Sequence, residues 1–239
     1  MNISIITINL NNKLGLNNTI TSVISQDSIP FEFIIIDGVS TDGSVELIND
    51  VEDNYDFVQS IIEHDQGVYD AMNKGILKAN GDYILFLNSG DVFFNNKTIC
   101  TIKRIVESPC DILIGKHSVG NKISKNKPLK DIWKGNFCSH QSTVYSAEFL
   151  KAFQYDLNFK FAADFKLLFI GFVMGNKLLI VDKTFSTIAP GGISDRNRVK
   201  VYLEYMKIIK ESEQLTLNRS IYFLVHIVIN CIKILIKQS

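Results

Sequence analysis

Four short apolar stretches in the first ninety residues are each bounded by polar loops, and helical patterns lie between them. The apolar stretches cover residues 3–8, 31–37, 57–63 and 83–88, and the helical patterns cover 17–26, 44–51 and 68–79. Strands that alternate with helices in this way build βαβ units around a largely parallel sheet. We therefore expect an α/β fold with an open, mixed and mainly parallel sheet flanked by helices.

The rest of the chain has a less regular pattern. DILIG, HQSTVYS and KLLIVD are strand-like, and residues 163–174 have a helical pattern. Residues 216–239 form a separate apolar segment, SIYFLVHIVINCIKILIKQS being its main part, with His226, Asn230 and Lys233 as interruptions. Its uninterrupted apolar run falls short of the ~20 residues that a membrane span requires. A helix at the membrane interface, a dimerisation helix or a helix on the protein's own surface fits this pattern.

Composition excludes several classes of protein. Lys and Arg number 25 and Asp and Glu number 25, so no net charge favours binding to nucleic acid. The four cysteines stand far apart, which fits neither a zinc cluster nor a disulfide framework and favours reduced thiols. The N-terminal MNISIITINL has no basic start and no cleavage pattern of a signal peptide. We expect a cytoplasmic protein, with a peripheral position on the inner face of the cell membrane as an option.

Polar side chains follow the predicted strands. Ligands of open α/β sheets bind at the carboxyl ends of the strands, so these side chains are candidates for one binding crevice. Each of them is also an ordinary turn or helix-capping residue when taken alone. The candidates are Thr7, Asn9, Asp37, Glu63, Asp65, Asn88 and Asp91.

The ligand class follows from what the loops lack and what Asp91 offers. NLNNKLG after the first strand has no G-x-G-x-x-G pattern, and no G-x-x-x-x-G-K-[ST] occurs in the chain. Asp91, in YILFLNSGD, is suited to a hard divalent cation, which needs few protein carboxylates when phosphates supply its other oxygen ligands. A nucleoside diphosphate is the ligand that this arrangement favours.

Several motifs resemble those of the family 2 glycosyltransferases of the GT-A fold. They are IITINLNN, IIIDGVSTDGS, EHDQGVYDAMNKGILKANGDYILFLNSGD, SHQSTVY and AADFKLL. The resemblance spans residues 2–195 and is greatest to bacterial enzymes that build capsule, O-antigen or exopolysaccharide. It implies a GT-A domain over 1–215, with a nucleotide-sugar-binding half over 1–95 and an acceptor-binding half over 96–215. Residues 216–239 would be a C-terminal helical extension.

The resemblance also implies a donor site. Its residues would be Thr7, Asn9, Asp37, Asp65, Asn73, Lys74, Asn88 and Ser89. Asp37 would hydrogen-bond the base, and a carboxylate can accept the imide N–H of uracil, which cytosine lacks. A UDP-sugar is therefore the expected donor. Lys74 is the one cation of this set, and we expect it to offset the phosphate charge.

The resemblance assigns the metal and the chemistry to two acids. Asp91 would bind Mg²⁺ or Mn²⁺, although the family's frequent Asp-x-Asp is replaced here by Asn88, Ser89 and Gly90 before Asp91. Asp164 would be the base that removes the acceptor's proton in an inverting transfer. Ala163 stands where the family often has a glutamate.

Two further side chains are candidates on the acceptor side. His140 would contact the diphosphate or the acceptor, and Trp133 would form a stacking surface. The loop 190–194, PGGIS, is of a kind that can close over a donor.

The function that the sequence favours is inverting transfer of a sugar from a UDP-sugar to a saccharide, lipid-linked acceptor in bacterial surface polysaccharide synthesis. A partner subunit that binds the donor without chemistry is an alternative, because Asp91 and Ala163 leave the site with few acids. A nucleotidyltransferase is another, although NLNNKLG lacks the expected Gly-rich basic loop. A homodimer and contact with a membrane surface stay open as partners.

Overall fold

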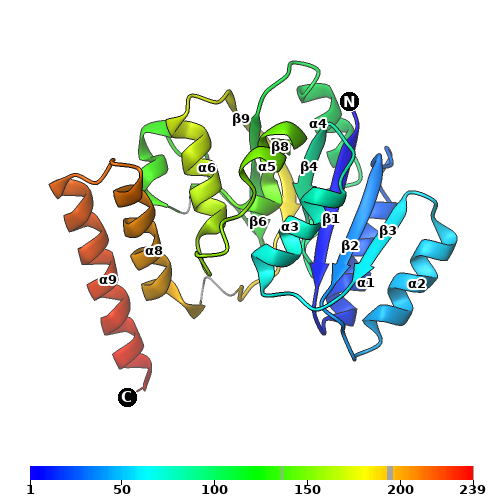
Figure 1. The fold of residues 1–239 in the computed structure, drawn as a ribbon, viewed down its shortest axis with the longest axis horizontal. Helices are drawn as coiled ribbons and strands as arrows, with labels where there is room; N and C mark the ends of the chain where they lie inside the picture. The colour runs from blue at the N-terminus through cyan, green and yellow to red at the C-terminus, as the bar shows by residue number, and fades with distance from the viewer. Residues whose placement is uncertain (136, 193–195, 239) are drawn as a thin grey trace.

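The computed structural model describes residues 1–135, 137–192 and 196–238, with the side chains described as far as residue 234. Its centre is one mixed sheet with helices on both faces (Figure 1). The strand order is β3-β2-β1-β4-β8-β6-β9-β5, and β7 pairs with β6. The strands are β1 (Ile3–Asn9), β2 (Glu32–Asp37), β3 (Val58–Ile62), β4 (Tyr83–Phe86), β5 (Val92–Phe93), β6 (Ile112–Val119), β7 (Lys122–Ile123), β8 (Thr143–Ser146) and β9 (Leu178–Thr187).

The first half of the sheet is parallel, as the alternating pattern predicts. β1 pairs in parallel with β2 and with β4, and β2 pairs in parallel with β3. From β4 onward the sheet is mixed, because β8 runs antiparallel to both β4 and β6 while β6 and β9 are parallel. The expected mixed α/β sheet is confirmed, with the parallel pairing concentrated at the N-terminal half.

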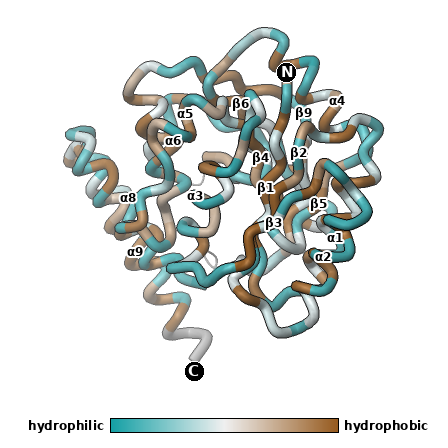
Figure 2. Tube along the Cα trace, turned by 45° about the vertical axis from the view of Figure 1, so that its right-hand side comes forward, coloured by the Kyte–Doolittle hydropathy of each residue, from teal (hydrophilic) through white to brown (hydrophobic). Residues whose placement is uncertain are grey.

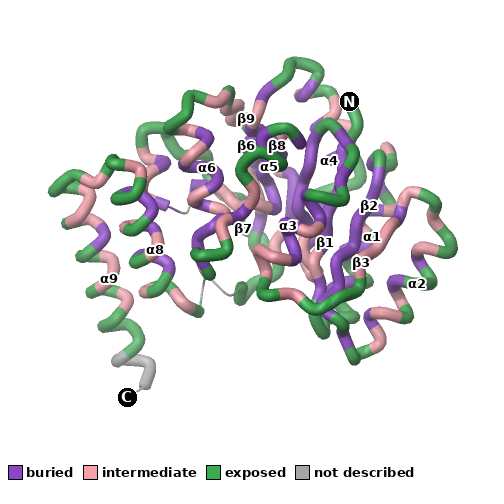
Figure 3. Tube along the Cα trace, viewed as in Figure 1, coloured by how far each residue is buried: buried purple, intermediate pink, exposed green. Residues whose placement is uncertain are grey.

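Helices cover both faces of the sheet because successive strand residues point to opposite sides. Ile5 and Phe33 pack in one cluster with α1 (Lys13–Ile24), α2 (Ser44–Asn54) and α4 (Thr98–Ile105). Ile6 and Ile34 pack in the other with α3 (Val68–Lys78), α5 (Ala147–Phe153), α6 (Ala163–Val173) and α8 (Arg198–Glu211). Strands β1, β2 and β4 are buried almost throughout (Figure 3), so their carboxyl ends are the places where they can meet a ligand.

Two local predictions were wrong in their bounds. The first helix begins at Lys13 and not at residue 17, because the Asn12 side chain accepts a hydrogen bond from the Gly15 amide and caps it. HQS is not part of a strand but forms the 3₁₀ turn η2 (His140–Ser142), and β8 starts directly after it. Because these residues form a turn and not a strand, the side chains of His140 and Gln141 do not alternate between the two faces of the sheet.

The C-terminal segment is a helix, α9 (Leu217–Gln238), which packs against α8 at the edge of the molecule (Figure 1). Phe223 of α9 is fully buried, and its ring lies edge-on to Trp133 in the 3₁₀ turn η1 (Leu129–Lys134). Trp133 therefore packs against α9, which does not favour the predicted role of its ring as an acceptor stacking surface. Of the loop 190–194, residues 193 and 194 lie outside the described part of the chain.

Candidate active site

The carboxyl ends of β1 and β2 are held together by buried polar groups. Asp37, which is 0% exposed, accepts hydrogen bonds from Asn9 Nδ2 at 2.7 Å and from the Ser40 amide and hydroxyl at 2.7 and 2.8 Å. The Thr7 hydroxyl donates to the Leu87 carbonyl at 2.6 Å and is equally buried. These side chains shape the rim of the sheet from inside it. Direct contact of Asp37 or Thr7 with a nucleotide does not fit this arrangement.

Asn9 is the rim residue with spare hydrogen-bonding capacity. Its Nδ2 donates to Asp37 and Ser40, but its Oδ1 is buried and has no partner.

Gly38, next to Asp37, lies close to the side chains of Asp65 and Leu10. A Cβ there would lie 3.1 Å from Asp65 Oδ2 and 3.2 Å from Leu10 Cδ1. The absence of a side chain at Gly38 thus lets the Asp65 carboxylate lie over the end of β2.

Lys74 lies within a group of acids and not beside an open phosphate site. Its Nζ is 2.7 Å from Asp65 Oδ1, 2.9 Å from Glu63 Oε1 and 3.6 Å from Asp70 Oδ2, and it donates to the His64 carbonyl at 2.7 Å. Burial opposes the charge, but the hydrogen bonds to Asp65 and Glu63 outweigh it and raise the pKa of Lys74 above its usual value. One cation among three carboxylates carries no surplus positive charge. The expectation that Lys74 offsets phosphate charge does not fit this arrangement.

Asn73 also points into the protein. Its Nδ2 donates to the Tyr155 carbonyl at 2.8 Å, and its Oδ1 accepts from the Tyr155 amide at 2.8 Å. The side chain is 9% exposed, so both ends of the amide are used to join α3 to the loop before α6. Its contribution to a donor site is to position this loop, and not to contact the donor.

We expect Asn73→Ala to lower the free energy of unfolding by about 1–3 kcal/mol, because it leaves a buried amide and carbonyl of Tyr155 without partners. Chemical denaturation of the two proteins measures this difference. A variant as stable as the wild type would mean that the Asn73 bridge contributes nothing to packing of the loop.

The turn after β4 holds the predicted metal ligand. Asp91 is 5% exposed, and it accepts hydrogen bonds from Gln141 Nε2 at 2.8 Å and from the Ala189 amide at 2.9 Å. The Thr19 hydroxyl donates to the Asp91 carbonyl at 2.7 Å and so attaches the turn to α1. Burial raises the pKa of Asp91, while the bonds from Gln141 and Ala189 oppose that rise. The turn is therefore rigid, and its acid is enclosed.

Ser89 lies in the same turn and is only half-buried. Its hydroxyl donates to the Asn12 carbonyl at 3.2 Å, and its own carbonyl accepts from Asn12 Nδ2 at 3.2 Å. Ser89 thus joins the turn to the start of α1, at the rim where the strand ends meet.

Asp164 is the centre of a second group of contacts. The Tyr69 hydroxyl donates to its Oδ1 at 3.1 Å, the Phe165 amide donates to the same atom at 2.8 Å, and His140 Nδ1 lies 3.6 Å from its Oδ2. Burial would raise the pKa of Asp164, but the neighbouring His140 outweighs it and holds the pKa below its usual value. Asp164 is therefore ionised at neutral pH and half-exposed.

The turn η2 connects the two acids. His140 Nε2 lies 3.0 Å from Asn88 Nδ2, and its other ring nitrogen faces Asp164. Gln141, the next residue, bonds Asp91. Two successive residues of one turn thus touch the end of β4 and the start of α6, so the predicted metal ligand and the predicted base belong to one constellation.

A divalent cation fits this constellation only as a partner of a bound diphosphate. Among residues 1–135, 137–192 and 196–234, no three His, Cys, Asp or Glu side chains are grouped as a metal cage would require. The Oδ1 atom of Asn88, three residues before Asp91 in the same turn, is buried and has no partner, and it is an oxygen of the kind that hard cations prefer. Two protein oxygens suit a cation whose other ligands come from phosphates and water.

Three functional groups were not identified from the sequence. They are the Tyr69 hydroxyl, the Gln141 amide and the backbone amide of Ala189. Tyr69 and Gln141 stand inside GVYDAMNKG and SHQS, so the motifs indicated these segments without indicating the side chains. No sequence signal marks a backbone amide that comes from a distant loop.

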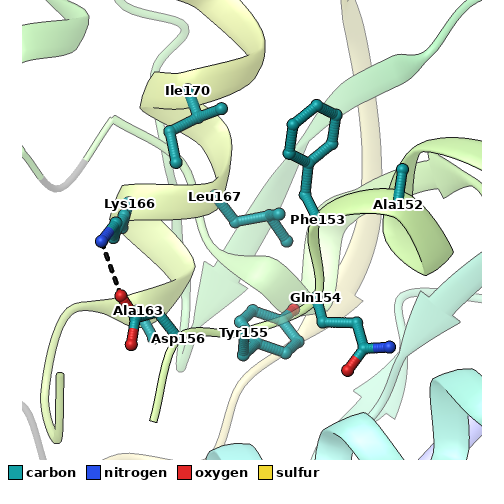
Figure 4. Close-up of a pocket in the computed structure, with 9 residues that line it drawn as sticks. All are labelled: Ala152, Phe153, Gln154, Tyr155, Asp156, Ala163, Lys166, Leu167 and Ile170. Carbon is teal, nitrogen blue, oxygen red and sulfur yellow. Dashed lines mark hydrogen bonds and ion pairs between the residues drawn. The ribbon is translucent and has the colours of Figure 1, made fainter. Parts of the chain in front are cut away.

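A cavity of about 460 Å³ lies on the outer side of α6, between this helix and the end of α5 (Figure 4). Its walls include Leu167 and Ile170, and an ion pair between Lys166 and Asp156 at 2.6 Å lies at one side. Ala163 lines it, next to Asp164 in the chain. The cavity is therefore close to the start of α6, but its lining does not include Asp91, His140 or Asp164.

Comparison with known proteins shows which family has a similar sequence. The family described as glycosyl transferase family 2 matches residues 4–169. An uncharacterized glycosyltransferase of Mycobacterium tuberculosis is 33% identical over 175 residues, which cover 68% of this chain and 65% of that protein. A PGL/p-HBAD biosynthesis glycosyltransferase of Mycobacterium bovis is 33% identical over 117 residues, or 47% of this chain and 45% of that protein. The chain thus matches no more than about two thirds of the length of these relatives.

Solved structures show the same fold at low sequence identity. TarS 1–349 of S. aureus, in complex with UDP-GlcNAc, has a TM-score of 0.70 at 17% identity and covers 93% of this chain and 70% of its own. Glucosyl-3-phosphoglycerate synthase of M. tuberculosis, in complex with Mn²⁺, UDP and its product, has a TM-score of 0.63 at 13% identity, with 90% of this chain and 81% of its own covered. At this identity the likeness concerns the fold.

Proposed function

Since this chain belongs to glycosyl transferase family 2 and has the GT-A fold, we propose that it transfers the sugar of a UDP-sugar to a saccharide acceptor with inversion at the anomeric carbon. The observation that carries this proposal is the turn η2, which links Asp91 to Asp164 through Gln141 and His140. A leaving-group site and a base must lie on opposite sides of one reacting carbon, and a short rigid connection between them meets that need.

In the proposed reaction, Asp164 accepts the proton of an acceptor hydroxyl while that oxygen bonds to the anomeric carbon. The bond from this carbon to the diphosphate oxygen breaks, and UDP leaves with the electron pair. Tyr69 and the Phe165 amide hold one carboxylate oxygen of Asp164, so the other is presented toward His140. The negative charge of a bound diphosphate raises the pKa of a nearby carboxylate, which makes Asp164 a better base when the donor is present.

Asp91 and Asn88 are the residues that we propose to hold Mg²⁺ or Mn²⁺ against the diphosphate. When bound, the cation stabilises the negative charge of the departing diphosphate. Support comes from the buried acid, from the unpartnered Asn88 Oδ1 and from the Mn²⁺ in the glucosyl-3-phosphoglycerate synthase complex. Gln141 and Ala189 fix the Asp91 carboxylate by hydrogen bonds before the cation arrives.

For recognition of the nucleobase, we propose that Asp65 accepts the uracil imide N–H and that Asp37 supports this contact from below. Asp65 lies over Gly38, where its carboxylate is 13% exposed, while both oxygens of Asp37 are enclosed. TarS and the synthase were solved with uridine nucleotides, whereas a mannosyltransferase of Pyrobaculum calidifontis with a TM-score of 0.68 was solved with GDP-Man. The carboxylate acceptor favours UDP for this chain.

We expect UDP to bind about tenfold to a hundredfold more tightly than CDP, because CDP leaves the buried acceptor without a donor. In Asp65→Asn this preference is expected to disappear. Calorimetric titration of both nucleotides into both proteins measures it. Glu63→Gln is the matched control, since it also removes a carboxylate that pairs with Lys74, but an exposed one. An unchanged preference in Asp65→Asn would exclude Asp65 as the base-reading residue.

For the acceptor, we propose a lipid-linked saccharide used in bacterial surface polysaccharide synthesis, at the inner face of the cell membrane. The resemblance of the motifs and the relatives named for PGL/p-HBAD biosynthesis support a glycolipid or glycan pathway. The 1–95 and 96–215 halves would then bind donor and acceptor, respectively. Release of UDP in the presence of lipid-linked saccharides tests this proposal and separates an enzyme from a partner subunit that only binds the donor.

A further inference from the structure

Helix α9 has an apolar surface on the side that faces away from the protein. Its inner side packs on α8 and η1 through Tyr222, the buried Phe223 and Ile227. Its outer side exposes apolar side chains over several turns, each between 41 and 77% exposed. They are Leu217, Ile221, Leu224, Val225, Val228, Ile229 and Ile232.

This outer surface is unusual for a helix on the surface of a globular protein. Such a helix normally has an apolar stripe against the core and a polar face toward water. In Figure 2, brown hydrophobic segments recur along α9, and in Figure 3 most of the helix is exposed or half-exposed. Contiguous exposed apolar side chains of this extent mark an interaction surface.

The charged residues of the segment 214–239 are all of one sign. Residues 214–239 contain Arg219, Lys233 and Lys237 and no acid. Over residues 196–239 there are eight Lys or Arg against three Glu, whereas residues 1–195 contain 17 Lys or Arg against 22 Asp or Glu. The chain is neutral as a whole, yet its C-terminal fifth is basic and the rest is acidic. An apolar surface with basic residues around it complements an anionic lipid surface.

We propose that the outer face of α9 lies in the surface of an anionic membrane, parallel to its plane. This inference does not depend on the proposed donor, acceptor or reaction. The helix would insert its apolar side chains at the boundary of headgroups and acyl chains, while the net positive charge of the C-terminal segment attracts the anionic headgroups.

Two other arrangements fit the structure less well. Among the described helices, α9 has the length and composition of a membrane span, but Tyr222, Phe223 and Ile227 on its inner side pack against the protein. Arg219 lies over the Trp133 ring at 5.1 Å and donates to the Gln214 carbonyl at 2.7 Å, so the start of the helix is held as well. Spanning would require α9 to leave these contacts.

A second copy of the chain is the other candidate to cover this face. Two α9 helices packed together would add the positive charge of one C-terminal segment to that of the other. Neither helix has an acid to offset this charge. Like charges at an apolar contact disfavour that pairing, whereas anionic lipid headgroups neutralise them.

The test is flotation of the full chain with vesicles of phosphatidylcholine alone and of phosphatidylcholine with phosphatidylglycerol. We expect binding to the anionic vesicles, at least about tenfold weaker binding to the neutral ones, and weakening by salt. Leu224→Glu with Val228→Glu should reduce binding to anionic vesicles by about a hundredfold, because two acids replace outer-face apolar groups. Deleting α9 is unsuitable because it also removes the buried Phe223.

Leu77→Glu with Met174→Glu is the matched control, since both side chains are exposed apolar groups outside α9. It should bind vesicles like the wild type, and both double variants should unfold at the wild-type temperature and bind UDP equally. Absence of vesicle binding by the wild type, equal binding to neutral vesicles, or full binding by the α9 variant would overturn the proposal. A wild-type dimer that the α9 variant makes monomeric, without vesicle binding, would assign the face to a second copy.

Discussion

Asp164→Asn is expected to lower kcat of sugar transfer by about 10²- to 10⁴-fold, the usual contribution of a positioned general base. The asparagine keeps the size of the side chain and can still accept from Tyr69 and the Phe165 amide, but it cannot take the acceptor's proton. UDP affinity should not fall, because the residue acts on the acceptor side and the variant removes a negative charge near the diphosphate. Initial rates of UDP release with a saccharide acceptor, together with calorimetry of UDP binding, measure the two effects.

A matched control for this variant is Asp156→Asn. Asp156 lies in the loop before α6 and is paired with Lys166 at 2.6 Å, with no contact to His140 or Tyr69. Its replacement should leave kcat near the wild-type value. If Asp164→Asn retains full activity, or if both variants lose activity equally, Asp164 is a helix-start acid that interacts with the helix dipole and is not the base.

Asp91→Asn is expected to abolish stimulation of UDP binding by Mg²⁺ or Mn²⁺ and to lower transfer by about 10³-fold, because the charge of the departing diphosphate would lose its stabilisation. Transfer by the wild type should fall similarly when a chelator removes the cation. UDP titrations with and without Mn²⁺, and rates in excess chelator, measure both effects. Asp82→Asn, at the opposite end of β4, is the control and should respond to Mn²⁺ like the wild type.

The stability of Asp91→Asn distinguishes a lost ligand from a lost fold. Burial raises the pKa of Asp91, so the folded chain holds this proton more tightly than the unfolded chain does. The ionised carboxylate therefore costs stability as pH rises from the ordinary Asp pKa through the raised one. Asparagine carries no such cost, although it accepts less well from Gln141 and Ala189. We expect thermal unfolding at neutral pH to change little, and a large loss of stability would show that Asp91 serves the fold.

Much of the fold follows from the sequence because its signals are local. The apolar runs that become β1, β2 and β4 contain enough β-branched and aromatic residues to indicate strands by themselves, and the helical pattern before Asn80-Gly81 predicts α3 almost to its last turn. The carboxyl ends of parallel strands lie at the same edge of a sheet, so the sequence alone places Asn9, Asn88 and Asp91 on the rim. The second half was less predictable because its antiparallel pairings join distant segments, as β5 with β9.

The sequence by itself therefore determined the fold family, the rim of the sheet and the acids Asp91 and Asp164 as the residues to consider. Tertiary structure alone decided which way the side chains point. Asp37, Asn73 and Lys74 have the residue types of a donor site, yet their hydrogen bonds are made to Ser40, Tyr155 and three carboxylates of the same chain. Composition and spacing show which groups are available, but partners 3 to 82 residues away in the chain decide which of them are free for a ligand. A polar group that is satisfied inside the protein has no reason to leave its partner for a substrate.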